Sequence, residues 1–248
     1  MSTVAEVLIL EGIIMAGRLY GIGVGPGDPE LLTLKAVFAI EKCDVIAVPE
    51  TGSGERTAFT IVEKYIEGKQ LLMCRFVMEH NMEKRKSSRQ KVADDIIACL
   101  DRGKDTGFIT LGDPTTYSTY MYIHEIVSDR GYETTIIPGV TSYSAAAAAA
   151  GVALCEGNET LSICAGHASD IDELLSRQGN TVIMKSGAAF TRVLDKLKER
   201  GLGDNAKIVC RATMPDQRVF QSIEDFENTP DAGYFTIAII TKASAARK

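Results

Sequence analysis

Residues 107–117, Gly-Phe-Ile-Thr-Leu-Gly-Asp-Pro-Thr-Thr-Tyr, limit the possible folds of this chain more than any other segment. An apolar strand runs directly into a Gly-Asp-Pro turn, and polar residues and a helical pattern follow. Open parallel sheets hold ligands at the carboxyl ends of their strands. Gly112 lets a ligand approach the backbone because it has no Cβ atom, and Pro114 favours an extended Asp113. The segment predicts a strand with a ligand-binding loop; considered alone, the turn also fits an ordinary loop.

A second glycine-rich turn opens the folded part of the chain. Residues 19–30, Leu-Tyr-Gly-Ile-Gly-Val-Gly-Pro-Gly-Asp-Pro-Glu, indicate a strand, a turn and a helix that begins near Leu31. A dinucleotide-binding Gly-x-Gly-x-x-Gly pattern would need glycine at Pro26, Asp28 or Glu30, and the sequence has no Gly-Lys-Ser/Thr phosphate loop. This turn therefore predicts a ligand held close to the backbone that need not be a pyrophosphate.

A third motif, residues 136–142 (Ile-Ile-Pro-Gly-Val-Thr-Ser), ends a strand and begins a helix that Thr141 or Ser142 can cap. The run from Ala145 to Ala150 predicts a smooth helix packed closely on a sheet, and Gly151 is a suitable C-terminal stop. The two hydroxyls lie at a strand end, where they can cap the helix, bind a ligand, or do both.

Together the three motifs, in this order and spacing, resemble the tetrapyrrole methylase family, whose members use S-adenosylmethionine (SAM) to methylate intermediates of sirohaem and cobalamin synthesis. The resemblance extends from about Leu19 to Thr241. It implies SAM as methyl donor, bound in a cleft between two domains, and a polycarboxylate tetrapyrrole as substrate. It also implies a homodimer. Methyl transfer from a sulfonium requires positioning rather than a metal or a nucleophilic side chain, so we expect no protein-bound metal.

The order of strand and helix patterns predicts a two-domain α/β fold. Alternation in the first half predicts a parallel sheet with helices on both faces, and the resemblance implies a mixed sheet in the second half. The expected strands are 19–24, 44–48, 70–74, 106–111, 133–137, 160–164, 180–185, 206–211, 217–222 and 233–241. The expected helices are 31–42, 57–67, 83–102, 117–130, 170–178 and 189–200.

We expect an N-terminal domain over residues 19–152, a linker over 153–159 and a C-terminal domain over 160–248. Residues 1–18 are interpreted as a native extension or an expression remnant, with an upstream start as a further alternative for the first fourteen. No basic residue precedes their apolar run, Val7 to Leu10, as a secretory signal would require, and this run is too short to span a membrane.

The chain has 248 residues and a formal net charge of −6, which argues against non-specific nucleic-acid binding. Its six cysteines are scattered through apolar segments without a Cys-x-x-Cys pair. We interpret them as buried thiols in a reducing cytoplasm rather than as disulfides or metal ligands.

The resemblance also implies which residues of this sequence contact the cofactor. The implied cofactor contacts are Pro26, Leu111, Gly112, Asp113, Thr141, Ser142, Met184, Ala212 and Thr241. Among these, Gly112 and Asp113 would hold the methionine part of SAM, and Met184, Ala212 and Thr241 the adenosine. Because Asp113 lies in a loop, we expect Asp113→Ala to weaken SAM binding and leave the fold intact.

Substrate carboxylates need local cations, preferably arginines. The substrate residues selected are Arg75, Tyr117 and Ser118. Further cationic candidates are Arg211, Arg218 and the run Lys84, Arg85 and Lys86, for which a solvated helix face is the alternative. His80 and His167 are candidates for assisting proton loss from the methylated carbon, whereas His124 falls inside a helix; no general base is assigned.

Two segments distinguish members of the family. Residues 113–122 and 151–159 resemble the corresponding runs in enzymes that methylate carbon 20 of precorrin-2 or cobalt-factor II. Uroporphyrinogen methylases instead have an Arg-Leu-Lys-Gly-Gly-Asp-Pro run, whereas Thr110 and Leu111 precede Gly112 here. They also have a Thr-His-Arg triplet where this sequence has Cys155, Glu156 and Gly157. Carbon-20 methylation is therefore favoured. The alternatives are another corrin position (carbon 17 or 11), ribosomal RNA, and non-catalytic binding of SAM or a tetrapyrrole.

Overall fold

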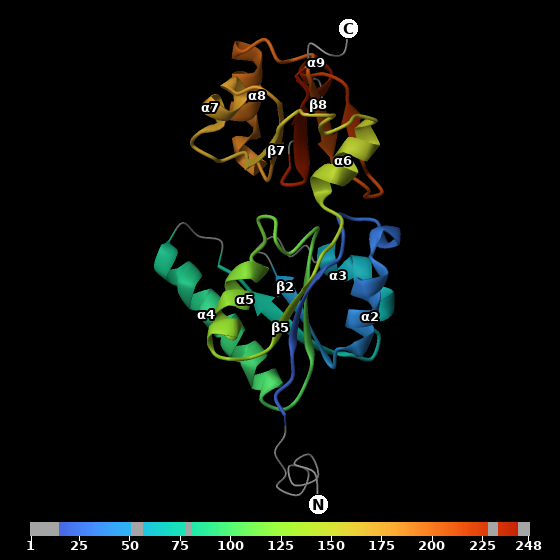
Figure 1. Ribbon diagram of the computed structural model, residues 1–248, viewed down its shortest axis with the longest axis vertical. Helices are drawn as coiled ribbons and strands as arrows, with labels where there is room; N and C mark the ends of the chain where they lie inside the picture. The colour runs from blue at the N-terminus through green and yellow to red at the C-terminus, as the bar shows by residue number, and fades with distance from the viewer. Residues whose placement is uncertain (1–14, 51–56, 78–80, 228–232, 243–248) are drawn as a thin grey trace, which may run out of the picture. The chain divides into compact units, whose positions relative to one another are not determined.

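The computed structural model describes residues 15–50, 57–77, 81–227 and 233–242. The chain divides into two compact units, the first ending at Val140 and the second beginning at Thr141 (Figure 1). Each unit has a five-stranded sheet and its own helices. In the described ranges, no helix combines the length and the apolar composition needed to cross a membrane.

The sheet of the first unit is parallel throughout, as predicted. Its strands are β1 (Leu19–Gly23), β2 (Val45–Glu50), β3 (Gln70–Arg75), β4 (Thr106–Thr110) and β5 (Thr134–Ile137), in the order β3-β2-β4-β1-β5. The helices are η1 (Pro29–Leu31), α2 (Leu34–Lys42), α3 (Thr57–Val62), η2 (Glu63–Tyr65), α4 (Met82–Leu100) and α5 (Tyr120–Asp129).

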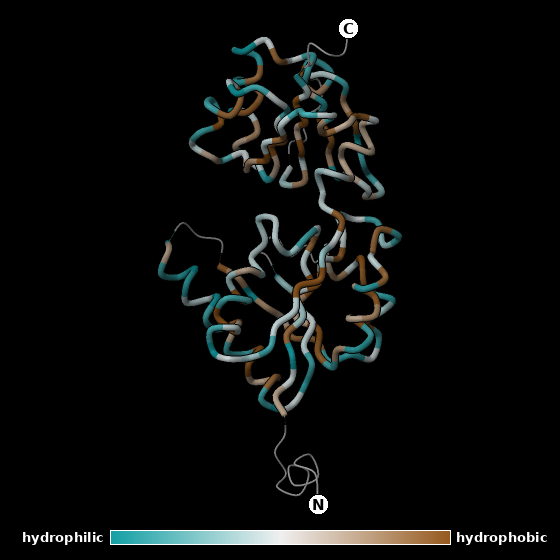
Figure 2. The backbone as a smooth tube through the Cα atoms, viewed as in Figure 1, coloured by the Kyte–Doolittle hydropathy of each residue, from teal (hydrophilic) through white to brown (hydrophobic). Residues whose placement is uncertain are grey.

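Helices cover both faces of this sheet. On one face, side chains of α2 and α3 pack against alternate strand residues, with Ile40 and Ile61 meeting Ile22 and Ile109 in one buried cluster. On the other face, α4 and α5 pack on a cluster that includes Phe108. Figure 2 shows the hydrophobic colour concentrated along the strands, while loops are paler or hydrophilic. Successive side chains of each strand point to opposite faces of the sheet, so each face has its own hydrophobic core.

The predicted helices of the first unit differ from the observed ones mainly at their starts. The expected helix 31–42 is two elements, because Thr33 has extended backbone angles and its hydroxyl accepts a hydrogen bond from the Ala36 amide at 3.1 Å. The expected helix 117–130 begins only at Tyr120, because Tyr117 has a φ angle of +50°. A residue with positive φ cannot continue a right-handed helix.

The sheet of the second unit is mixed, in agreement with the expectation. Its strands are β6 (Leu161–Ala165), β7 (Asn180–Met184), β8 (Ala206–Cys210), β9 (Arg218–Phe220) and β10 (Thr236–Ile240), in the order β6-β7-β10-β8-β9. Only the β6–β7 pair is parallel. The helices are α6 (Ser142–Ala150), α7 (Ile171–Ser176), η3 (Gly187–Ala189), α8 (Phe190–Glu199) and α9 (Ile223–Glu227). Helix α9 was not predicted from the sequence.

Helix α6 belongs to the second unit. Thr141 caps its N-terminus, and Gly151, with φ at +67°, ends it as expected. Ala145 to Ala147 are buried against strands of the second sheet, so the expected close helix–sheet packing is present. The compact units therefore divide the chain before this helix, whereas the sequence analysis placed the helix in the N-terminal domain. The apolar face of α6 decides this, because it packs on β8 and β10 rather than on the first sheet.

The cysteines are not all buried, which corrects one expectation. None forms a disulfide, and all are buried except Cys155, which is exposed in the loop after α6. Burial raises the pKa of the Cys43 and Cys74 thiols to about 12 and that of Cys164 to about 11. Because the thiolate is the nucleophile, these groups are unreactive near neutral pH.

We therefore expect a water-soluble disulfide reagent at pH 8 to modify one thiol per chain in the native protein and all six after denaturation. Cys155→Ser should abolish the native reaction, and Cys74→Ser should leave it unchanged. Rapid native labelling of two or more thiols would contradict the burial described above.

Candidate functional site

The first two glycine-rich turns meet at the carboxyl ends of β1 and β4, which are parallel neighbours. The Gly112 amide donates a hydrogen bond to the Gly25 carbonyl at 2.7 Å, and the Gly25 amide donates to the Gly112 carbonyl at 3.3 Å. Both glycines have positive φ, +78° and +74°, which side chains other than glycine rarely adopt. Pro26, the next residue, is buried. The predicted strand-end site is thus a backbone-paired loop assembly.

The third turn joins the same assembly through Gly139. A Cβ atom on Gly139 would lie 2.2 Å from the Gly112 carbonyl oxygen, and one on Gly23 would lie 2.6 Å from the Gly139 amide nitrogen. Such distances are too short for any real side chain. The three motifs predicted to act together are therefore in direct backbone contact. We refer to residues 23–26, 111–113 and 139 as the three-loop site.

Asp113 ties two of these loops together. Its side chain is buried, with the residue 9% exposed. Oδ1 accepts hydrogen bonds from the Thr115 amide, at 2.8 Å, and from the Thr115 hydroxyl. Oδ2 accepts from the Gly139 amide at 3.0 Å. The expectation that Asp113→Ala leaves the fold intact assumed that a loop carboxylate makes few contacts. That assumption is wrong, because the Asp113 carboxylate accepts hydrogen bonds from the backbone amides of Thr115 and Gly139.

Ser118 also has a local structural role. Its hydroxyl lies 2.9 Å from the Thr110 hydroxyl and accepts a hydrogen bond from the Tyr120 amide at 3.1 Å, at the start of α5. Tyr117 is 48% exposed. Of the two predicted substrate residues in this loop, Tyr117 is accessible to a ligand, and Ser118 holds the loop.

Charge in the three-loop region favours a particular class of ligand. Residues 20–30, 107–118 and 136–140 contain no lysine or arginine. A phosphate or pyrophosphate site would normally carry such cations or a Gly-rich phosphate loop. Glycine backbone that a ligand can approach closely, in loops that themselves contain no cation, instead suits a small ligand with a net positive charge. SAM, with its sulfonium and ammonium groups, fits this environment.

Arg75, the predicted substrate cation of the first unit, is the last residue of β3 and forms an ion pair with Glu50, with Nε and Oε2 2.9 Å apart. Its side chain is 87% exposed. The basic run of residues 84–86 lies in the first turns of α4 and is exposed, in keeping with a solvated helix face.

The second unit groups two of the remaining predicted cofactor residues. Met184, which ends β7, and Ala212, just after β8, are buried in one cluster with the alanines of α6. Thr141 accepts a hydrogen bond from the Ser144 amide as the N-cap of that helix, and Ser142 is its first residue. Met184 thus contributes to core packing, as its sequence position alone would suggest.

Thr241 does not lie with Met184 and Ala212, which corrects the predicted adenosine set. Strand β10 runs antiparallel to β7 and β8, and Ile240 pairs with Thr181 and Ala206 near the starts of those strands. Thr241 therefore lies at the opposite end of the sheet, roughly 13 Å from Met184 along the strands, and farther from Ala212, at about 3.3 Å per strand residue. The sequence could not show this, because strand direction depends on tertiary pairing.

The residues that do share the sheet end with Met184 and Ala212 were predicted only in part. Lys185, Thr213, Tyr234 and Phe235 were missed. Arg211, Arg218 and His167, which lie at the same sheet end, were sequence candidates. Lys185, Arg211 and Thr213 have φ angles of +52°, +52° and +65°. Non-glycine residues with positive φ often mark functional sites, but their backbone angles give no signal in a single sequence.

The histidines take different positions. His124 is partly buried on α5, with Nδ1 3.3 Å from the Tyr120 hydroxyl, which gives it a packing role. His167 is exposed in the turn after β6, at the same sheet end as Lys185. His80 lies outside the described residues.

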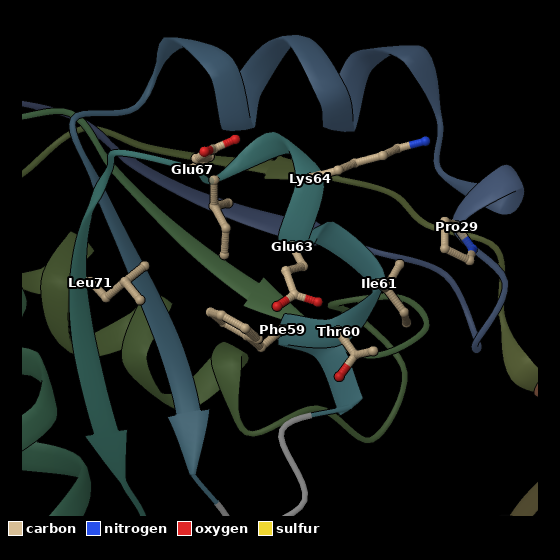
Figure 3. Close-up of a pocket in the computed structure, with 9 residues that line it drawn as sticks. Pro29, Phe59, Thr60, Ile61, Glu63, Lys64, Glu67 and Leu71 are labelled. Carbon is tan, nitrogen blue, oxygen red and sulfur yellow. The ribbon is translucent and has the colours of Figure 1, made fainter.

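A surface cavity of about 520 Å³ lies elsewhere in the first unit. Figure 3 shows Phe59 and Glu63 projecting from the α3–η2 segment toward the strand that carries Leu71. The lining also includes Glu67, and none of the predicted site residues. Its lining has two carboxylates and one cation, Lys64, a balance that does not favour a polycarboxylate ligand.

With the loops and the two sheets established, the comparison with known proteins identifies the class. The chain belongs to the Tetrapyrrole (Corrin/Porphyrin) Methylases, whose family model it matches over residues 18–226. It is therefore a methyltransferase of this family, and the resemblance inferred from the three motifs is confirmed.

Two relatives and one solved structure narrow the comparison. A probable cobalt-precorrin-2 C(20)-methyltransferase of Methanocaldococcus jannaschii is 33% identical, covering 91% of this chain and 96% of the relative. The cobalt-precorrin-2 C(20)-methyltransferase of Salmonella typhimurium is 28% identical, covering 92% and 98%. The Thermus thermophilus uroporphyrin-III C-methyl transferase, solved with S-adenosyl homocysteine, has a TM-score of 0.69 at 19% identity, covering 91% and 98%. That structure supports the fold.

Proposed function

We propose that this protein transfers a methyl group from SAM to carbon 20 of precorrin-2 or its cobalt-containing form in corrin biosynthesis. The observation that carries the proposal is the joining of the three loops through Gly25, Gly112 and Gly139, in a chain similar to carbon-20 methyltransferases along nearly its whole length. We further propose that the enzyme is cytoplasmic and homodimeric and needs no protein-bound metal.

The proposed cofactor contacts come from both units. In the first unit, the methionine part of SAM would be held by the backbone of Gly112, by Leu111, which precedes it, and by Pro26, which follows Gly25. Asp113 fixes that backbone through Gly139 and is thus a positioning residue. In the second unit, Met184 and Ala212 remain candidate contacts of the adenosine, together with Thr141 and Ser142. Thr241 is no longer a candidate, because it lies at the opposite end of the sheet.

SAM supplies a methyl group already activated by the positive sulfur, so the protein's task is to align it with the substrate carbon and to exclude water. Such positioning can lower a barrier by roughly 7–11 kcal/mol. The rigid glycine pairing suits this task, since a loop bonded through its backbone has few alternative conformations. Tyr117, exposed beside the three-loop site, is a candidate substrate contact.

The test is mass spectrometry of products after anaerobic incubation with SAM and, separately, cobalt-factor II and metal-free precorrin-2. We expect a gain of one methyl group with at least one substrate, located at carbon 20 by NMR. The cobalt form is the first choice, because both relatives are named for it.

SAM binding is measured in parallel by calorimetry. A one-methyl product substituted at carbon 11 or 17 would replace the carbon-20 assignment. Measurable SAM binding without turnover of either substrate would refute it and direct the search to later corrin intermediates or to RNA.

A further inference from the structure

One end of the second sheet gathers cations around two aromatic rings. Lys185 follows β7 and Arg211 follows β8, on either side of the residues that precede β10. The Arg211 amide donates to the Phe235 carbonyl at 2.9 Å. Because β10 lies between β7 and β8, the two cationic residues are separated by two strand spacings, or roughly 10 Å.

The side chains at this end form a row across the sheet, in the order Lys185, Tyr234, Phe235 and Arg211. Nζ of Lys185 lies 5.6 Å from the centre of the Tyr234 ring, and Cζ of Arg211 lies 5.6 Å from that of Phe235. The two rings pack edge to face at 5.3 Å. Both cations thus flank one aromatic pair, of which Tyr234 is 49% exposed.

A third cation extends the cluster. Arg218 begins β9 and pairs in register with Cys210, the residue before Arg211. One carboxylate, Asp216, accepts a hydrogen bond from Nε of Arg211 at 2.6 Å. The pKa of Asp216 is lowered, chiefly by this hydrogen bond and to a smaller extent by the charges of Arg211 and Arg218. Three cationic side chains thus lie at one end of the second sheet, in a chain whose net charge is −6.

The geometry points to this sheet end as the subsite for peripheral carboxylates of the tetrapyrrole, with Lys185, Arg211 and Arg218 as specificity-determining residues. The inference rests on the function proposed above. Arginine binds carboxylates through two N–H donors at once, and its planar group and exposed rings suit a flat macrocycle with acidic groups at its edge.

Two of these cations are next in sequence to proposed cofactor contacts of the second unit. Lys185 follows the proposed adenosine contact Met184, and Arg211 precedes the proposed contact Ala212. Both cationic residues also have positive φ angles, a conformation that persists where the surroundings enforce it. The alternative ligand for these cations is the carboxylate of SAM itself, and the experiment separates the two.

The test compares Lys185→Gln, Arg211→Gln, Arg218→Gln and the triple variant with the intact enzyme. Arg192→Gln, on the exposed side of α8, is the matched control. Lys185→Gln and Arg218→Gln leave the Arg211–Asp216 pair in place, so they remain informative if Arg211→Gln folds poorly. Each protein is titrated with precorrin-2 under anaerobic conditions and with SAM by calorimetry, and kcat and KM are measured.

We expect the triple variant to bind precorrin-2 at least about ten-fold more weakly, with KM raised, kcat within a few-fold of the intact enzyme, and SAM affinity unchanged. Added salt should raise KM more in the intact enzyme than in the triple variant. Arg192→Gln should behave like the intact enzyme.

Unchanged precorrin-2 binding in the triple variant, beside normal turnover by the intact enzyme, would overturn this inference and leave the proposed function standing. Loss of SAM affinity in the same variant would assign the cations to the cofactor and also overturn it. If the intact enzyme neither binds nor methylates precorrin-2 or its cobalt form, the proposed function fails and this subsite fails with it.

Discussion

Gly139→Ala is expected to abolish measurable SAM binding and to lower the melting temperature by several degrees. The added Cβ would lie 2.2 Å from the Gly112 carbonyl oxygen and 2.8 Å from the Gly23 carbonyl carbon. Both are backbone atoms of the three-loop site, so no side chain can move aside to relieve the contact. Forced overpacking costs about 1–3 kcal/mol or more, and the relief available here is to separate the loops.

Calorimetry with SAM and a thermal melt would measure both effects. Gly203→Ala is the control, because the nearest atom to an added Cβ there is 4.0 Å away. A Gly139→Ala variant that binds SAM as the intact protein does would show that contact between these loops is not needed for the cofactor.

Asp113→Ala is expected to weaken SAM binding by at least about ten-fold and to destabilise the first unit. The substitution removes the acceptor for the Gly139 and Thr115 amides and for the Thr115 hydroxyl. A buried donor left without an acceptor costs about 1–3 kcal/mol. Asp113→Asn should have a smaller effect, because its oxygen can still accept from Thr115 while its amide group faces the Gly139 N–H.

Denaturant unfolding and SAM titration would rank the two variants against Asp129→Ala, which removes an exposed carboxylate from α5. Reduced affinity with unchanged stability would favour direct contact between Asp113 and SAM. Equal stability and affinity in all three would remove Asp113 from the site.

The strands and most helices could be predicted because their patterns are local. Strand ends such as Phe108 to Leu111 followed by Gly-Asp-Pro indicate parallel strands with ligand loops. The alanine helix could be read with its cap at Thr141 and its stop at Gly151. Errors at helix starts arose where backbone conformation overrides composition, as at Tyr117 with its positive φ.

Part of the candidate site could also be predicted, because its glycine-containing turns are local sequence patterns. Gly112 and Asp113 were selected because a glycine-containing turn after a strand is visible in the sequence. Their contact with Gly139 was not predicted, and only the structure shows it. The role of Asp113 was misjudged, since a loop carboxylate looks exposed until its hydrogen-bond partners are known.

The sequence by itself therefore determined the α/β class, the parallel first sheet and the loops that carry the site, because these depend on side-chain periodicity and on turn residues. Only the tertiary structure decided that α6 packs on the second sheet and that Thr241 lies at the far end from Met184. It alone brought Lys185 and Arg211 to one sheet end. Strand direction, pairing order and the partner of an apolar helix face result from long-range packing, which no local pattern encodes.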